Sequence, residues 1–316
     1  QRLEGFYESV RMRAAGVDNA EGKQRIVVEL YEKFFRIGFP RTAKALGIVY
    51  TPTQVVDFIL RSANDTLRAE FGTTLTEPGV HILDPFTGTG TFIVRLIQTG
   101  LIRTEDLARK YANELHANEI VLLAYYIAAI NIEAAYHGAV GGEYQPFNGI
   151  VLTDTFQIAE VGDTMDAELF PQNNDRIIAQ QSQPIRVIVG NPPYKSGQGS
   201  ANDNNANQPY PTLDAAISAT YAAKSTAKLK SKLYDSYVRA IRWATDRIGD
   251  AGIIAYVTNS GWITGNTTAG LRLAMPEEFS ALYIYDLRGN QRQSDWRAEG
   301  GKIFDDGSQT GAAILI

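Results

Sequence analysis

Two short motifs have the residue types needed to bind a nucleotide-like ligand and to act on an amine. The first is Asp84-Pro85-Phe86-Thr87-Gly88-Thr89-Gly90-Thr91-Phe92, in which a carboxylate precedes a glycine-rich turn. The second is Asn191-Pro192-Pro193-Tyr194, in which an amide precedes two prolines and an aromatic ring. Each motif follows a short apolar run that predicts a strand. Open α/β sheets bind ligands at the carboxyl ends of such strands, so we interpret both motifs as parts of a ligand site.

The first motif predicts a cofactor turn. A phosphate-binding Walker loop requires a lysine after its last glycine, and the dinucleotide fingerprint requires a small residue where Ile93 stands. A turn without these features suits a cationic, phosphate-free ligand such as S-adenosylmethionine. A purely structural strand-to-helix turn is the alternative. We expect the cofactor contacts of this motif to come from Asp84, Pro85, Phe86, Thr87, Gly88, Gly90, Thr91 and Phe92.

Acidic residues end the next two predicted strands. Glu119 is placed to bind the two ribose hydroxyls of a nucleoside, and Glu114 is the alternative. A solvated carboxylate at a helix start would explain either residue equally well. At the end of the third strand, Asp154 and Thr155 are candidates for contact with the cofactor, with Asp154 accepting from the adenine amino group. Asp154 could instead cap the following helix.

The second motif suits the activation of an aromatic amine. Such an amine is a weak nucleophile because its lone pair is delocalised into the ring. The side-chain oxygen of Asn191 and the carbonyl of Pro192 can accept hydrogen bonds from the NH2 group and favour a localised lone pair. Pro192 and Pro193 stiffen the turn. Tyr194 offers a face on which a base flipped out of a duplex could stack.

The elements that position these motifs alternate between strand and helix. This alternation predicts an α/β fold with an open, seven-stranded, mostly parallel sheet of the Rossmann-like kind. The expected helices cover 90–98, 120–136, 231–248 and 269–275. The expected strands cover 80–84, 115–119, 150–153, 185–189, 252–257, 281–286 and 311–316.

Two segments depart from this alternation. Residues 1–48 are rich in charge with apolar residues at helical spacing, which predicts a helical N-terminal extension before a catalytic domain over 49–316. Residues 195–211 are crowded with Gly, Ser, Asn, Asp and Gln, a composition that predicts a mobile loop. This expected loop directly follows Tyr194.

Composition excludes several classes of protein. The chain has 316 residues, of which 44% are hydrophobic and 21% charged, values typical of a globular protein. No apolar run is long enough to span a membrane. The absence of cysteine excludes disulfides, thiolate metal sites and cysteine nucleophiles. His81, His116 and His137 stand in no metal-ligand spacing, so no metal is expected.

Charge and the first residues bear on cellular context. The chain begins with Gln1 and has no signal peptide, so we expect a piece of a longer cytoplasmic protein. The net charge of -5 is unusual for a freestanding nucleic-acid binder. Within it, residues 221–249 contain seven basic and two acidic side chains. A solvated helix face is the ordinary explanation for this segment, and a contact with phosphates is the alternative.

The two motifs together resemble those of the amino-group DNA methyltransferases. Tyr50-Thr51-Pro52-Thr53-Gln54 and the residues up to Ile59 are similar to the Thr-Pro helix that precedes the cofactor turn in the γ order of these enzymes. The resemblance extends over residues 49–316. It implies transfer of a methyl group from S-adenosylmethionine to the N6 amine of a flipped adenine in DNA.

The resemblance also implies roles for further residues. Tyr50, Thr51 and Pro52 would contact the cofactor, with Thr51 closing over its methionine end. Phe304, in Lys302-Ile303-Phe304, resembles the aromatic that stacks on the extruded adenine beside Tyr194. A phenylalanine at this position could equally be a core residue.

The N-terminal residues resemble a more specific group, the single-polypeptide type I (ISP) restriction-modification enzymes. The similarity lies in Phe6-Tyr7-Glu8-Ser9-Val10-Arg11 and Tyr31-Glu32-Lys33-Phe34-Phe35. It implies double-stranded DNA as partner, nuclease and helicase domains before this chain, and a target-recognition domain after it that the chain itself lacks. It also implies the cytoplasm of a prokaryote. Such neighbouring domains would supply much of the grip on DNA and would explain the acidic net charge.

Alternatives to the DNA function remain open at this point. Methylation at cytosine C5 is excluded because it requires a cysteine nucleophile. A protein-glutamine or RNA amino-methyltransferase could use the same tetrapeptide. A non-catalytic cofactor-binding module of a larger machine is a third interpretation. A glutamine enzyme would transfer methyl to release factor without DNA, and a scaffold would bind cofactor and transfer nothing.

Overall fold

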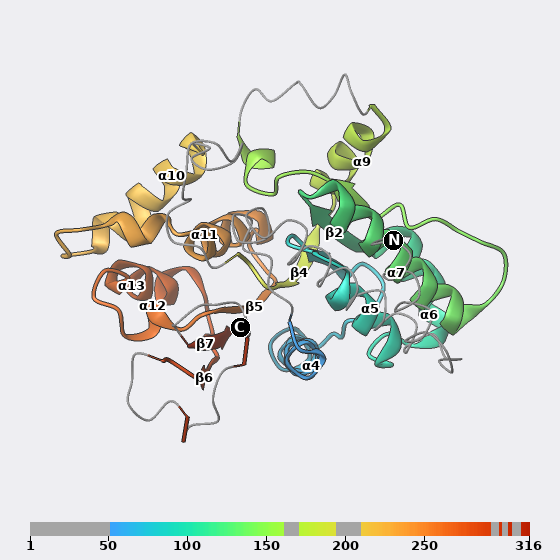
Figure 1. The fold of residues 1–316 in the computed structure, drawn as a ribbon, viewed down its shortest axis with the longest axis horizontal. Coiled ribbons are helices and arrows are strands. Elements are labelled where there is room, and N and C mark those ends of the chain that lie inside the picture. The colour runs from blue at the N-terminus through green and yellow to red at the C-terminus, as the bar shows by residue number, and fades with distance from the viewer. Residues whose placement is uncertain (1–50, 161–170, 194–209, 292–296, 299–302, 305–310) are drawn as a thin grey trace, which may run out of the picture.

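Seven strands form one mixed sheet at the centre of the chain (Figure 1). The computed structural model describes residues 51–160, 171–193, 210–291, 297–298, 303–304 and 311–316. The strand order is β3-β2-β1-β4-β5-β7-β6, with β7 antiparallel to both neighbours and the other pairs parallel. The strands are β1 (His81–Asp84), β2 (Leu115–Glu119), β3 (Ile150–Leu152), β4 (Ile185–Gly190), β5 (Ile253–Asn259), β6 (Ile284–Arg288) and β7 (Ala312–Leu315). The mostly parallel seven-stranded sheet expected from the sequence is confirmed.

Register places the two chemical motifs side by side. β1 and β4 are hydrogen-bonded neighbours, with Leu83 opposite Ile188. Gly190, at the end of β4, lies opposite Tyr256 of β5. Asp84 at the end of β1 is paired with Ala117 on the other side. The residues that follow β1 and β4 therefore leave the same edge of the sheet.

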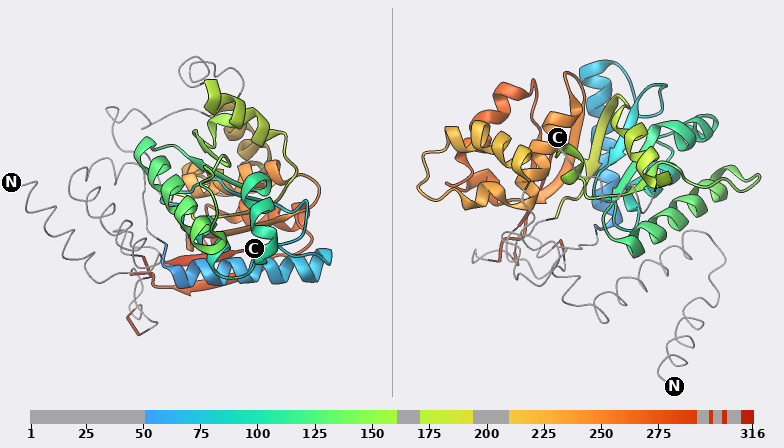
Figure 2. Two further views of the ribbon diagram at one scale, coloured as in Figure 1. Left: turned by 90° about the vertical axis from the view of Figure 1, so that its right-hand side faces the viewer. Right: turned by 90° about the horizontal axis from the view of Figure 1, so that it is seen from above.

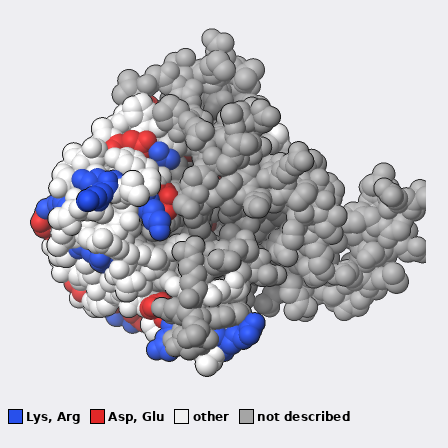
Figure 3. All heavy atoms as spheres, turned by 60° about the vertical axis from the view of Figure 1, so that its left-hand side comes forward, with Lys and Arg blue, Asp and Glu red and all other residues white. Residues whose placement is uncertain are grey.

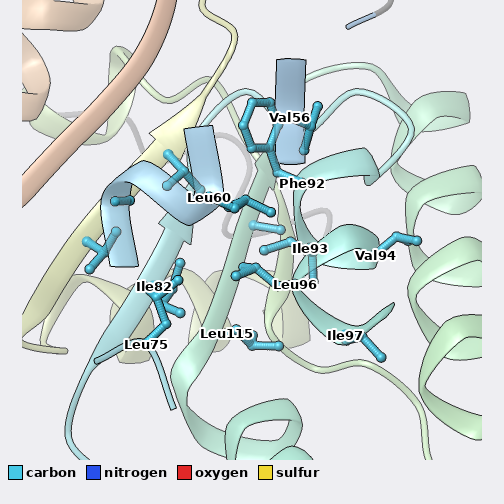
Figure 4. Packing of buried hydrophobic residues seen from close by; sticks show 14 of the residues in the cluster. Val56, Leu60, Leu75, Ile82, Phe92, Ile93, Val94, Leu96, Ile97 and Leu115 are labelled. Carbon is cyan, nitrogen blue, oxygen red and sulfur yellow. The ribbon is translucent and has the colours of Figure 1, made fainter. Parts of the chain in front are cut away.

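Helices cover both faces of the sheet (Figure 2). One face packs against α4 (Thr53–Phe71), α5 (Thr91–Gln98) and α7 (Leu122–Val140), and its apolar cluster includes Val56, Ile93 and Leu115 (Figure 4). The opposite face packs against α10 (Pro211–Ile217), α11 (Ser236–Ile248) and α13 (Ala269–Glu278). Strand residues alternate between the two clusters, as the side-chain period of a strand requires.

The remaining elements are short. They are α6 (Thr104–Arg109), η1 (Lys110–Glu114), η2 (Gln157–Ala159), α9 (Pro171–Gln181), η3 (Ser218–Ala222), η4 (Ser231–Tyr234) and α12 (Gly261–Thr264). Among the described helices, none is both long and apolar enough to cross a membrane.

The expected strands and helices agree with the structure within a few residues at their ends. The loop expected over 195–211 is wrong at its end, because Pro211 is the first residue of α10, where proline is favoured since the first helical N–H needs no partner. The rest of that loop lies outside the described residues. So do the expected N-terminal extension, Tyr50, Tyr194 and Lys302.

Candidate active site

The turn after β1 is held by backbone hydrogen bonds and by one close helix contact. The Thr87 N–H donates to the Asn118 carbonyl at 3.0 Å, and the Thr87 hydroxyl donates to the Asp84 carbonyl at 2.9 Å. Gly90 has a φ of 89°, and a Cβ there would lie 3.3 Å from Ala128 of α7. Glycine is therefore favoured at position 90 both by its backbone conformation and by the approach of α7.

Asp84 is completely buried at the start of this turn. Its Oδ1 accepts a hydrogen bond from the Phe86 N–H at 3.1 Å, and its Oδ2 is buried with no partner among the described residues. Burial raises the pKa of Asp84 to about 8; the Phe86 bond opposes this rise, and the Glu119 charge adds to it. A buried carboxylate oxygen without a donor is costly unless a ligand supplies one.

Glu119 and Glu114 lie at opposite edges of the sheet. The Glu119 carboxylate accepts from the Gly88 and Val121 N–H groups, each at 2.7 Å. Burial raises the pKa of Glu119 to about 7, against these backbone hydrogen bonds. Glu114 precedes β2 and pairs with Arg109 at 2.6 Å. Only Glu119 therefore stands at the edge that contains Asp84.

Asn191 directly follows β4, and its amide is oriented by Thr51, which lies just before α4. Its Nδ2 donates to the Thr51 hydroxyl at 2.9 Å, across 140 positions of sequence. Its Oδ1 is buried and has no partner among the described residues. The hydrogen bond to Thr51 occupies the donor side of the amide and leaves the acceptor side available. Pro192 is buried and Pro193 half-buried beside it.

Gly190 allows the ends of β4 and β1 to approach each other. A Cβ at Gly190 would lie 2.9 Å from Asp84 Oδ1 and 3.6 Å from the ring of Tyr256. The Tyr256 hydroxyl is also buried without a partner, and burial followed by the Asp84 charge raises its pKa well above the ordinary value. Sequence reasoning did not single out Tyr256. Its position opposite the residue before Asn191 could have indicated it.

The segment after β3 packs against the cofactor turn. The Thr155 hydroxyl donates to the Pro85 carbonyl at 2.5 Å and accepts from Asn118 at 3.2 Å. The Phe156 ring lies 5.5 Å from the Phe86 ring. The Asp154 Oδ1 accepts from the Phe156 N–H at 2.9 Å just before η2. Asp154 thus bonds the backbone as a cap would, and it also stands at the edge that holds Asp84.

Two predicted site residues lie in the apolar core. Phe92 is 3% exposed and Phe304 is 6% exposed, and both belong to the apolar cluster on the α4 and α5 face of the sheet. Figure 4 shows Phe92 in this cluster. For Phe304 this is the core position that the sequence left open as an alternative. Thr91 is half-buried, with its hydroxyl 3.5 Å from that of Thr89.

The basic segment 221–249 is partly neutralised within the chain. Lys224 pairs with Glu277 at 2.6 Å, and Arg239 pairs with Asp214 at 2.8 Å. On the face drawn in Figure 3, basic side chains stand in separate groups rather than in one continuous stripe. These pairs favour the ordinary explanation of a solvated surface over a phosphate track.

The fold and this edge together define an α/β protein with a polar ligand site built from the ends of β1, β2 and β4. The chain belongs to the N-6 DNA methylase family, whose model matches residues 22–258. This match confirms the resemblance of the two motifs to those of the amino-group DNA methyltransferases.

Solved structures extend the similarity to the full chain. The chain is 49% identical to part of the Type ISP restriction-modification enzyme LlaGI, solved as a nuclease-deletion mutant with a DNA substrate mimic, with a TM-score of 0.87 over 100% of this chain and 26% of that one. The chain is also 49% identical to part of LlaBIII, an ATP-dependent Type ISP enzyme bound to DNA, with a TM-score of 0.88 over 99% of this chain and 22% of that one. With DrdV, solved in complex with DNA, the identity is 41% and the TM-score 0.90, over 99% of this chain and 30% of that one. The chain therefore spans between 22% and 30% of the length of these proteins.

Proposed function

We propose that this chain uses S-adenosylmethionine to methylate the N6 amine of an adenine flipped out of double-stranded DNA. The observation that supports this most directly is a pair of buried acceptors without partners, Asp84 Oδ2 and Asn191 Oδ1. Asp84 is the last residue of β1 and Asn191 directly follows β4, and these two strands are hydrogen-bonded neighbours. The Asp84 oxygen suits a cationic ligand and the Asn191 oxygen suits a neutral amine, the two chemical groups that this reaction must bring together.

The described residues fit the cofactor. Asp84 would accept from its α-amino group, Glu119 would bind the ribose hydroxyls, and Asp154 would accept from its adenine amine. Thr51 and the Thr87–Gly90 turn would enclose the methionine end. When bound, S-adenosylmethionine supplies a methyl group activated by its sulfonium. The raised pKa values of Asp84 and Glu119 support these roles, because a buried carboxylate gains most from a bound donor.

The target amine would be activated by Asn191 and the Pro192 carbonyl. Both would accept hydrogen bonds from the NH2 group and hold its lone pair toward the methyl group. Thr51 fixes the amide of Asn191 so that this acceptor is in place before the base arrives, which reduces reorganisation during the reaction. Tyr194 would stack on the extruded base. A contribution of Phe304 would require its ring to leave the core position described above.

The larger context follows from the similarity to the Type ISP enzymes. We propose that residues 49–316 form the catalytic domain and residues 1–48 an extension that joins it to preceding nuclease and helicase domains. A target-recognition domain would follow. The setting would be the cytoplasm of a bacterium, where such an enzyme modifies duplex DNA.

The test is nucleoside mass spectrometry of plasmid DNA from a host that lacks adenine methylation. We expect N6-methyladenine in cells that express the protein and none in cells that express its Asn191→Ala variant. Asn113→Ala changes an exposed asparagine whose side chain, among the described residues, bonds only the Arg109 carbonyl, so this matched control should retain methylation. DNA without N6-methyladenine in every sample, with methyl incorporated into RNA or release factor, would overturn the DNA assignment in favour of the RNA or protein one.

A further inference from the structure

One hydrogen bond joins the segment after β3 to the residue that precedes α10. The Tyr210 hydroxyl donates to Asp154 Oδ2 at 2.8 Å, while Asp154 Oδ1 accepts from the Phe156 backbone. The two bonds use both carboxylate oxygens and fix the plane of the group. Tyr210 is 3% exposed, so water competes little for this bond.

The ring of Tyr210 is itself held from two sides. Phe156 packs edge-on against it with the ring centroids 5.3 Å apart, and the Arg239 guanidinium lies 5.2 Å from its centroid. Arg239 is fixed in turn by a bidentate pair with Asp214, with both N–O distances 2.8 Å. Burial of a tyrosine does not by itself require the contacts with Phe156 and Arg239. These contacts aim one hydroxyl at one carboxylate oxygen.

A second pair of hydrogen bonds, which does not involve Tyr210, joins the same two segments. The Glu160 carboxylate accepts from the Thr212 and Leu213 N–H groups at 2.8 and 3.0 Å. This second pair caps the first turn of α10. Loss of the Tyr210 hydroxyl should therefore leave the segments together while it frees the carboxylate of Asp154 to rotate.

We propose that Tyr210 is a positioning residue for cofactor recognition, which holds the Asp154 carboxylate in the orientation that selects a ligand with an adenine amino group. The inference rests on the proposed role of Asp154. It goes beyond that role because it assigns the orientation, and hence the discrimination between amino and oxo purines, to a side chain outside both motifs. Burial raises the pKa of Asp154, and the hydrogen bond from Tyr210 opposes this rise and so favours the ionised form, which accepts from an amine.

The test compares two product-like ligands by calorimetry. S-adenosylhomocysteine has the 6-amino group, and S-inosylhomocysteine has a 6-oxo group in its place. We expect the unaltered chain to prefer the amino ligand. Tyr210→Phe should weaken binding of the amino ligand by roughly tenfold and leave the oxo ligand unchanged, so that the preference falls by the same factor.

Two further variants make the test specific. Tyr111→Phe removes a hydroxyl that donates to the Gln145 carbonyl at 2.8 Å. Tyr111 lies in η1, which precedes β2 at the amino edge of the sheet, so this variant should leave both affinities unchanged. In an Asp154→Asn background, Tyr210→Phe should produce no further loss of preference, because the two residues act through one contact.

The outcomes separate the inference from the proposed function. Equal weakening of both ligands by Tyr210→Phe, or no weakening of either, would overturn the positioning role while leaving the cofactor assignment intact. Absence of any preference in the unaltered chain would overturn the role of Asp154 and the inference with it. Failure of the unaltered chain to bind S-adenosylhomocysteine would overturn the proposed cofactor itself.

Discussion

The two edges of the sheet differ in the partners that they give to buried carboxylates. At the amino edge, Glu114 accepts from Arg109 at 2.6 Å, from Lys110 at 2.8 Å and from the Gly79 N–H at 2.9 Å. Lys110, fully buried, also donates to the Glu77 and Val80 carbonyls. At the carboxyl edge, by contrast, the buried atoms without partners include Asp84 Oδ2, Asn118 Oδ1, Asn191 Oδ1 and the Tyr256 hydroxyl.

The pKa values differ in the same sense. Burial would raise the pKa of Glu114, yet the hydrogen bonds from Lys110 and Gly79 bring it below its ordinary value. Burial raises the pKa of both Asp84 and Glu119, and neither carboxylate has an ion pair with another described residue. Burial of polar groups alone therefore does not distinguish a ligand site from a structural network of ion pairs. For these carboxylates, the distinguishing feature is whether a cationic side chain of the chain is paired with them, as Arg109 and Lys110 are with Glu114.

Asn191→Ala should produce the largest effect and sharpen this contrast. Removing a preorganised acceptor at the reacting amine should lower the methylation rate by about 10³-fold. Cofactor affinity should stay within a few-fold, because Asn191 is expected to face the amine and not the cofactor. Single-turnover methylation and calorimetry on the same preparation measure the two effects. Equal losses of rate and affinity would contradict this division.

Glu114→Gln should affect stability instead of chemistry. The variant leaves the buried Lys110 without a counter-charge, so we expect a loss of about 3 kcal/mol in the free energy of unfolding. Denaturant titration measures this loss. Glu105→Gln is the matched control, because its carboxylate is 74% exposed and lies 3.6 Å from Arg103; it should change stability by about 0.5 kcal/mol or less. A weaker cofactor affinity in folded Glu114→Gln would break the comparison between the edges.

Asp84→Asn should stabilise the fold and weaken the cofactor site. The pKa of Asp84 is about 8 in the folded chain and its ordinary value is 3.8. The unfolded chain therefore ionises first, and the fold loses stability as the pH rises from about 4 to about 8. Because each pKa unit corresponds to about 1.4 kcal/mol, we expect the variant to be more stable by up to about 5 kcal/mol at about pH 8 and equally stable at about pH 4.

Cofactor affinity should fall at least tenfold in the same variant, since a neutral amide replaces the acceptor for a cationic amine. Thermal unfolding at the two pH values and calorimetry at neutral pH measure these effects. A variant with the same stability as the unaltered chain at both pH values would show that burial of the ionised Asp84 carboxylate does not destabilise the fold.

Thr51→Val should have the smallest effect. It removes the hydroxyl that orients the Asn191 amide and leaves the side-chain shape almost unchanged. We expect the methylation rate at saturating cofactor to fall about three- to tenfold, the range for loss of one positioning hydrogen bond. Thr53→Val makes the same change two residues later and should have no effect. A rate as low as that of Asn191→Ala would show that Thr51 does more than orient the amide.

Strands and motif positions were predictable from sequence, because both depend on local pattern. Most strands coincide with an apolar or β-branched run, as at Ile185–Gly190. The helix α9 was missed because its sequence is mostly polar and only Asn173 and Gln180 are buried. Pro211 offered a helix-start signal that the polar composition of the preceding residues obscured.

The contacts that complete the site were not predictable, because they join distant residues. The Asn191–Thr51 bond spans 140 positions and the Asp154–Tyr210 bond spans 56. The choice between Glu119 and Glu114 depended on strand direction, since the two residues flank the same five-residue strand. Burial of Phe304 depended on which helices cover it.

The close approach of β4 to β1 at Gly190 sets a length scale for the reaction. Neighbouring strands in a sheet lie about 4.8 Å apart, and this spacing is fixed by backbone hydrogen bonds. The groups proposed to hold the methyl donor and the methyl acceptor extend from two such neighbours. The sheet therefore fixes the distance between these groups, and sequence changes elsewhere cannot easily lengthen that distance. Under the proposed function, sequence changes in the surrounding loops then leave the distance over which the methyl group travels unaltered.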